Sequence, residues 1–290
     1  MGQTHKEKVE KLKKALPDVQ KNKDDRGISI NRVGVEDIKF PLFITTKEGG
    51  ENLVTATINL YGSLRHQVKG VSMSRFIEIL MKWKFKNIDR NSLEQLLIEL
   101  RDHLGKEDVE DVYIEISFDY FITKTTPISN QECVMSYPCT FTARLKEYYK
   151  FWLKVEVLAS SSCPCSKEIS TMGAHNQRSH IIVNVEPLRG NLIWLEDLIK
   201  TIEKCGSCEI WSLLKRVDEK YVTETAYSNS KFCEDIARQT SLALQEMGSL
   251  SKFKIKVCND ESIHQHNAVS YVARRLKGDS WVKDGGGLKH

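Results

Sequence analysis

The alternation of apolar and polar residues divides this chain into stretches with strand-like and helix-like spacing. Residues 28–44 and 52–64 are rich in β-branched residues with partial alternation, and the segment TTKEGGE between them predicts a turn. We therefore expect a pair of antiparallel strands. Residues 1–27 lack the apolar periodicity of a core element, which predicts a polar N-terminal arm.

Two helical patterns and further strands complete the first half. The apolar residues of 72–85 recur on one helical face, with Ser72 as the expected N-cap. The leucines of 91–104 do the same, with Asn91 as the expected cap. Strand-like patterns then return over residues 112–125 and 139–159.

The second half repeats this order without close sequence identity. Its strands are expected to end near residue 159 and to cover 180–188, 252–260 and 268–275, and its helices to cover 191–205 and 230–247. The prediction is an α+β fold of two β-β-α-α-β-β modules, residues 28–148 and 149–290, with antiparallel sheets. Helices would cover one face, and the exposed sheet edges could be satisfied by assembly into an oligomeric barrel.

Composition and charge narrow the possible functions. The chain has 290 residues with 43 Lys and Arg against 39 Asp and Glu, a formal net charge of +4. This mild excess suits an anionic small molecule, and since basic residues alternate with acidic ones, it argues against nucleic-acid binding. We find no apolar run of the ~18 residues that a membrane helix needs and no secretory signal. The eight cysteines are therefore expected to be reduced thiols in a cytoplasm.

The segment SSSCPCSKEISTMGAHNQRSH, residues 160–180, concentrates groups that carry chemistry. Cys163 and Cys165 are too close in sequence for a zinc-finger knuckle. Each thiol or histidine alone is most simply a packing or solvated group, but their clustering favours a functional site. Cys163 and His175 are therefore candidate members of a metal-ligand set.

A second cysteine pair, Cys205 and Cys208, leaves two interpretations open. CxxC can be a redox pair, or it could form a structural zinc site together with Cys163 and Cys165. However, redox pairs begin helices, where the dipole lowers the thiol pKa, and this pair ends one. Packing is the favoured interpretation.

Acidic and imidazole groups occur in two further places. Glu219 lies in a stretch expected to be irregular, and Glu234 falls in the first turn of a helix beginning near Ser230, where its carboxylate could accept two N–H bonds from a guanine edge. His264 and His266 would share one face if their stretch were extended. Together with Cys163 and His175 these groups suit a catalytic Zn²⁺, Fe²⁺ or Mn²⁺ that activates a water. The residues alone thus indicate a metal-assisted hydrolase or lyase acting on an anion.

Several motifs in order resemble the type IB GTP cyclohydrolase family, to which the archaeal GTP cyclohydrolase of methanopterin synthesis is closely related. The resemblance covers about residues 16–275 and rests on LPDVQ, VGVEDIKFPL, MSRF, SSSCPCSK, GAHNQRS, LLKRVDEKYVTETAYSNSKFCED and ESIHQHNA. It implies a tunnelling fold and a homotetramer with sites between subunits. It also implies hydrolytic opening of GTP at C8, release of formate and formation of 7,8-dihydroneopterin triphosphate, the first step of tetrahydrofolate-type pterin biosynthesis. Archaeal relatives give a cyclic phosphate instead.

The resemblance also assigns roles to residues of this chain. A divalent metal, Mn²⁺, Fe²⁺ or Zn²⁺, would be bound by Cys163, His175, Glu219 and His264. Cys165 is then expected to be a thiol that packs or lies behind the metal ligands. The residues expected at the reacting atoms are Cys163, His175, Glu261 and His266. Guanine would be anchored by Glu234, and the triphosphate by Lys167, Arg178, Lys215 and Arg216. The chain departs from the family at Ser72, where a histidine is expected, and at Ser230, where a proline is usual.

Two alternative functions were weighed, one another enzyme and one a protein without catalytic activity. Another tunnelling-fold purine or pterin enzyme, such as a 7-deazaguanine nitrile reductase, would need a lone nucleophilic cysteine and NADPH, and the sequence has no nicotinamide signature. A non-catalytic zinc-thiolate module would instead require the two cysteine pairs to share one metal.

Overall fold

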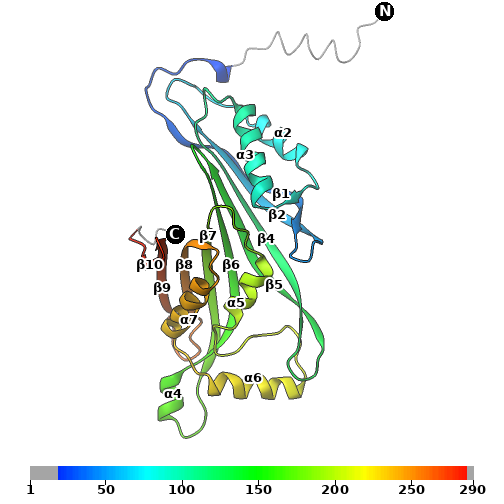
Figure 1. Ribbon diagram of the computed structural model, residues 1–290, viewed down its shortest axis with the longest axis vertical. Helices are drawn as coiled ribbons and strands as arrows, with labels where there is room; N and C mark the ends of the chain where they lie inside the picture. The colour runs from blue at the N-terminus through cyan, green and yellow to red at the C-terminus, as the bar shows by residue number, and fades with distance from the viewer. Residues whose placement is uncertain (1–18, 286–290) are drawn as a thin grey trace, which may run out of the picture.

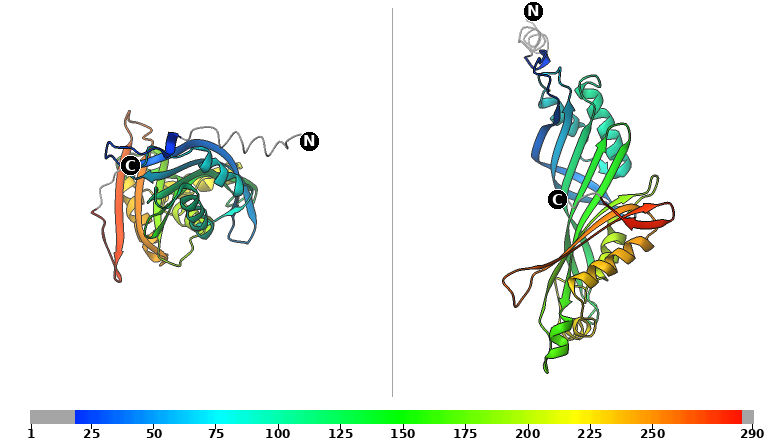
Figure 2. Two further views of the ribbon diagram at one scale, coloured as in Figure 1. Left: turned by 90° about the horizontal axis from the view of Figure 1, so that it is seen from above. Right: turned by 90° about the vertical axis from the view of Figure 1, so that its left-hand side faces the viewer.

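One continuous sheet of ten strands organises the computed structural model, which describes residues 19–285 (Figure 1). The strand order is β10-β9-β8-β7-β6-β5-β4-β2-β1-β3. All neighbours are antiparallel except β1 and β3, which pair in parallel over two residues. The sheet is strongly twisted, so that β8 and β9 run at a steep angle to β1 and β2 (Figure 2).

The first half has the predicted order of elements, with the two-residue strand β3 added between its two helices. After a short 3₁₀ turn, Val19–Lys21, come β1 (Ile30–Thr45), β2 (Glu51–Leu64), α2 (Ser74–Lys82), β3 (Asn87–Ile88), α3 (Arg90–Leu104), β4 (Val112–Thr125) and β5 (Glu132–Leu145). Most of the predicted N-terminal arm, residues 1–18, lies outside the described residues.

The second half contains more elements than the pattern predicted. They are β6 (Tyr149–Ser162), α4 (Pro164–Ile169), β7 (Asn176–Pro187), α5 (Leu195–Glu203), α6 (Arg216–Ser228), α7 (Cys233–Glu246), β8 (Leu250–Asn259), β9 (Ala268–Lys277) and β10 (Ser280–Lys283). Helices α4 and α6 and strand β10 are therefore additions to the expected β-β-α-α-β-β order. The single strand predicted over residues 139–159 was wrong, since the chain turns at residues 146–148 and this stretch belongs to two strands, β5 and β6. The expected division at residues 148 and 149 falls at this turn, and the sheet continues across it.

Helices cover one face of the sheet. Every second residue of β4, β5 and β6 is buried along most of their length, as expected when a single face packs against helices. Helices α2 and α3 lie over the first half and α5 and α7 over the second (Figure 1). Leu93, Leu97 and Leu100 of α3 and Ile236 and Leu244 of α7 are fully buried.

The predicted helix caps were wrong. Asp89 caps α3 in place of Asn91: its carboxylate accepts the Ser92 N–H at 2.7 Å, and the Ser92 hydroxyl accepts the Asp89 N–H at 2.8 Å. Helix α2 begins after Met73, and the Ser72 hydroxyl contacts the Ser74 hydroxyl instead of capping the helix. A polar residue one or two positions away offers the same donors and acceptors, so composition alone does not choose the cap.

Helix α6 crosses one end of the sheet, between α4 and the turn joining β4 to β5 (Figure 1). The expected irregular stretch around Asp218 and Glu219 is thus helical. Only Asp218 and Ala226 are buried in this helix, so it has no apolar stripe that would predict it. Among the helices of residues 19–285, none is long and apolar enough to cross a membrane.

Candidate active site

Cys163 and His175 are held together by their backbones. The Cys163 N–H donates to the His175 carbonyl at 3.0 Å, and the His175 N–H donates to the Ser166 hydroxyl at 3.0 Å. Cys163 directly follows β6 and His175 directly precedes β7, whose last and first residues are paired across the sheet. The segment between them, which includes α4, is therefore a closed loop that brings a thiol and an imidazole to one place.

The side chains of this pair have partners that orient them. The Cys163 sulfur accepts the Ser166 N–H at 3.4 Å, at the start of α4. His175 Nδ1 lies 3.0 Å from the Gln177 amide oxygen. Because that oxygen can only accept, Nδ1 is the donor in this contact, which leaves Nε2 as the ring nitrogen that a metal could bind. Both residues are half-buried, whereas Cys165, which we expected to pack, is exposed.

The loop between β8 and β9 leaves the same end of the sheet. Its first residue, Asp260, donates its N–H to the Arg178 carbonyl at 2.9 Å, and its carboxylate contacts His180 Nε2 at 3.0 Å. The loop is not extended, since residues 262–266 form bends, so the condition under which His264 and His266 would share a strand face is not met. His264 and His266 still come side by side, with stacked rings whose centroids are 5.1 Å apart, and both are exposed.

Glu219 lies at the opposite end of α6 from Cys163. The neighbouring Asp218 fixes this end: its carboxylate accepts the N–H groups of Ile128 and Ser129 at 3.0 and 2.9 Å, the Lys215 N–H at 2.9 Å, and the Ser129 hydroxyl. Burial raises the pKa of Asp218, but these hydrogen bonds outweigh it and hold the pKa well below its ordinary value. The start of α6 is thereby attached to the turn between β4 and β5.

The other end of α6 is attached to α4. Lys167 donates to the Tyr227 and Ser228 carbonyls at 2.7 and 3.4 Å, and its ammonium lies 4.6 Å from the centre of the Tyr227 ring. The rise of an α-helix puts Glu219 about 13 Å along the axis from Ser228. Within residues 19–285, no three His, Cys, Asp or Glu side chains come close enough to hold one metal ion. One chain thus unites Cys163 with His175 but not with Glu219.

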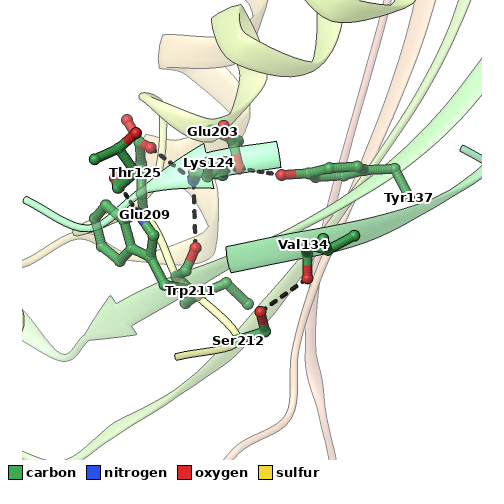
Figure 3. Close-up of polar contacts among 9 residues, drawn as sticks. Lys124, Thr125, Val134, Tyr137, Glu203, Glu209, Trp211 and Ser212 are labelled. Atoms are coloured by element: carbon green, nitrogen blue, oxygen red, sulfur yellow. Dashed lines mark hydrogen bonds and ion pairs between the residues drawn. The ribbon is translucent and has the colours of Figure 1, made fainter. Parts of the chain in front are cut away.

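A buried ionic cluster fixes the segment that connects α5 to α6 (Figure 3). Lys124 of β4 donates to Glu203 and Glu209 at 2.8 Å each, and Tyr137 of β5 donates to Glu203 at 2.6 Å. The side chains of Lys124 and Glu203 are only 11% and 6% exposed. The cluster therefore joins the first half of the sheet to the end of α5.

Two further hydrogen bonds extend this attachment toward α6. Trp211 donates its indole N–H to the Thr125 carbonyl at 3.1 Å, and the Ser212 hydroxyl donates to the Val134 carbonyl at 2.8 Å (Figure 3). No local pattern in the sequence predicts this cluster, since its partners are far apart in the chain and a lysine in a strand is usually solvated.

Glu234 lies in the first turn of α7, as predicted, although the helix begins at Cys233. Asp235 accepts the Phe232 N–H at 3.1 Å, so it is Asp235 that satisfies the helix start. Glu234 is exposed, and its carboxylate accepts the Cys233 thiol at 3.2 Å. Burial, together with this carboxylate, raises the pKa of Cys233 to about 11.

The basic residues expected at the triphosphate form two groups. Arg178 is exposed on β7, near Cys163, and Lys167 lies on α4. Lys215 and Arg216 are exposed at the start of α6, at the Glu219 end. Glu261 is half-buried and directly follows Asp260, whose N–H donates to the Arg178 carbonyl.

The protein therefore has an α+β fold that is built on one mostly antiparallel sheet and is similar to the tunnelling fold. The uricase of Arthrobacter globiformis has a similar fold, with a TM-score of 0.50 at 9% identity, over 90% of this chain and 96% of that one. The family model for type I GTP cyclohydrolase FolE2 matches residues 16–270. The chain belongs to this family.

Curated relatives agree with this assignment. GTP cyclohydrolase FolE2 of Geobacter sulfurreducens is 45% identical over 89% of this chain and 97% of its own length. The enzymes of Geobacter metallireducens and Azoarcus sp. are 44% and 42% identical, over 90% and 91% of this chain and 98% and 96% of their own lengths. The predicted enzyme class is confirmed: a GTP cyclohydrolase, a hydrolase of the first step of folate-type pterin biosynthesis.

Proposed function

We propose that the chain opens GTP hydrolytically at C8, releases formate and forms 7,8-dihydroneopterin triphosphate. The observation that carries this proposal is the Cys163–His175 pair, with the His175 ring oriented by Gln177. A thiolate and an imidazole are ligands that Zn²⁺, Fe²⁺ and Mn²⁺ accept, so the donors present fit part of a catalytic divalent metal site. When bound, the metal supplies Lewis acidity that makes a water nucleophilic at neutral pH.

The remaining ligands are proposed to come from another subunit. Glu219 is fixed at the far end of α6 from Cys163 of the same chain, so it can meet a Cys163–His175 pair only on a neighbouring copy. Exposed His264 is proposed to complete the set. Open sheet edges support such an assembly: β3 covers β1 only at Phe43 and Ile44. We propose a homotetramer closed into a barrel, with sites between subunits.

The other residues are assigned by what their groups can do. Glu234, an exposed carboxylate at a helix start, accepts the two N–H groups of the guanine edge. His266, with Glu261, delivers a proton to purine N7, which makes C8 electrophilic. The triphosphate is neutralised by Lys167, Arg178, Lys215 and Arg216, and because these form two groups in one chain, the neighbouring copies would contribute one group each.

The product is proposed to keep its linear triphosphate, as opposed to the cyclic phosphate formed by archaeal relatives. We place the enzyme in the cytoplasm, in keeping with its eight free cysteines. The test is to incubate purified protein with GTP and Mn²⁺, Fe²⁺ or Zn²⁺ in turn, and to assay formate and the fluorescent pterin that appears after oxidation. Mass spectrometry of the product counts its phosphates. GTP left intact with all three metals would overturn the proposal.

A further inference from the structure

We infer that Lys231 is a positioning residue that fixes Cys163 relative to Glu234 by binding the tight turn Cys205–Cys208, here called the CGSC turn. The inference rests on the proposed function, which gives Cys163 the metal and Glu234 the guanine. It assigns a role to a motif that neither redox chemistry nor a structural zinc site explains.

The CGSC turn is bonded to the end of β6. The Ser207 N–H donates to the Ser160 carbonyl at 2.8 Å, and the Ser160 N–H donates to the Cys208 carbonyl at 2.8 Å. The Ser162 N–H donates to the Ser207 hydroxyl at 3.2 Å. Ser162 is the residue before Cys163, so the turn holds the backbone from which the expected metal ligand extends.

The approach of the turn to the sheet requires a glycine. A Cβ on Gly206 would lie 2.4 Å from the Ala159 Cβ and 3.1 Å from the Ser160 carbonyl oxygen. Any side chain at position 206 would therefore push the turn away from the end of β6, so the close contact depends on this residue.

Side chains from the segment before Glu234 bind the other side of the turn. The Lys231 ammonium donates to the Cys205 and Gly206 carbonyls at 3.1 and 2.9 Å. The Asn229 amide donates to the Gly206 and Ser207 carbonyls at 3.3 and 2.9 Å. Both residues belong to the link between α6 and α7.

Lys231 also contacts β6 directly through its backbone. Its N–H donates to the Ser162 carbonyl at 3.0 Å, and its carbonyl accepts the Ser161 hydroxyl at 3.1 Å. One residue thus touches both the CGSC turn and the last two residues of β6, three positions before Glu234. The relative placement of Cys163 and Glu234 is fixed through these contacts.

The environment of Lys231 indicates that its place is specific. The residue is half-buried, and its ammonium binds neutral carbonyl oxygens, while burial lowers its pKa. A partly buried ammonium costs free energy unless its hydrogen bonds have good geometry. These carbonyls follow the C-terminal end of α5, where the helix dipole favours a positive charge.

The two cysteines of the turn serve packing. Both are buried, and the Cys205 thiol donates to the Thr201 carbonyl at 3.3 Å. Burial raises the pKa of both thiols, that of Cys208 to about 11, so both stay protonated at neutral pH. Protonated buried thiols are poor nucleophiles and poor metal ligands.

The test compares Lys231→Met with Lys231→Arg, which keeps donors for the carbonyls, and with Lys220→Met, which removes an exposed lysine of α6. We measure kcat and KM for GTP and the metal bound per chain. Displacement of a positioned group costs about 10- to 100-fold in rate. Lys231→Met should lower kcat/KM by that factor, raise KM and reduce bound metal. Lys231→Arg should recover most of the loss, and Lys220→Met should match the wild type.

The possible outcomes distinguish failure of the positioning role of Lys231 from failure of the proposed reaction. Wild-type kinetics and metal content in a folded Lys231→Met variant would overturn the positioning role and leave the proposed reaction intact. An inactive wild-type protein that binds metal would overturn the reaction, and the metal content of the variants would still report on Lys231. If Lys231→Met does not fold, Asn229→Ala and Gly206→Ala loosen the same turn. Wild-type KM and metal content in both would overturn the inference.

Discussion

The backbone N–H of Cys163 donates to the carbonyl oxygen of His175, with 3.0 Å between nitrogen and oxygen. This bond closes the loop that leaves β6 and returns as β7, so two donors separated in sequence are fixed by the ends of adjacent strands. Such a site is held by the sheet, and the short helix α4 within the loop leaves both side chains half-exposed. Both side chains are therefore reached from solvent.

Replacing Gln177 by Ala should weaken metal binding without removing a ligand. The Gln177 oxygen fixes the tautomer of His175, and loss of such a partner typically costs 10- to 100-fold in affinity, so we expect a change of about that size. Metal titration of the purified protein measures it. Gln177→Glu, which keeps an acceptor, is the control, and equal affinities for the Ala and Glu variants would contradict the assigned tautomer.

Asp218→Asn should destabilise the protein in a pH-dependent way. The pKa of Asp218 is lowered in the folded state, so its contribution is fully present above the unfolded value of about 4 and is lost as pH falls toward the folded pKa. Urea unfolding of wild type and variant should differ by a constant amount near neutral pH, and the difference should shrink below about pH 4. A difference that grows on acidification would contradict this account.

Lys124→Met should destabilise the fold strongly. The change leaves Glu203 buried without its cation, and breaking a buried pair in this way costs about 3–5 kcal/mol. Lys47→Met is the matched control, because Lys47 and Asp197 form an exposed pair worth about 0–1 kcal/mol. Denaturant unfolding measures the free energy of unfolding of both variants. Similar decreases in the two variants would show that the Lys124 cluster does not stabilise the contact between β4 and α5.

The alternation and helical periodicity of apolar residues, which reflect burial, predicted much of the fold. Strand β4 was predicted over residues 112–125 and is found there, because its alternation reflects one covered face. Helix α6 escaped prediction, since its buried residues are an aspartate and an alanine. Its conformation depends on the hydrogen bonds of Asp218 to the turn between β4 and β5, which are far away in the sequence.

The site could be predicted in part for a related reason. Cys163 and His175 lie in one short segment, and the structure brings them together. The motif around Glu219 also pointed to this residue as a metal ligand. Its position in the sequence does not show, however, that α6 holds Glu219 at the far end from Cys163. The contacts of the Lys124 cluster and of the CGSC turn involve partners from distant elements, and no local spacing predicts these contacts, although the CxxC spacing itself was recognised.

Cys163 and Glu219 of different subunits are proposed to complete one site, and complementation between two inactive variants tests this most directly. Cys163→Ala and Glu219→Ala should each abolish metal-dependent GTP turnover. Unfolding and refolding the two variants together should restore activity, because some interfaces then combine an intact Cys163 with an intact Glu219. Mixed oligomers as inactive as either variant alone would contradict the claim.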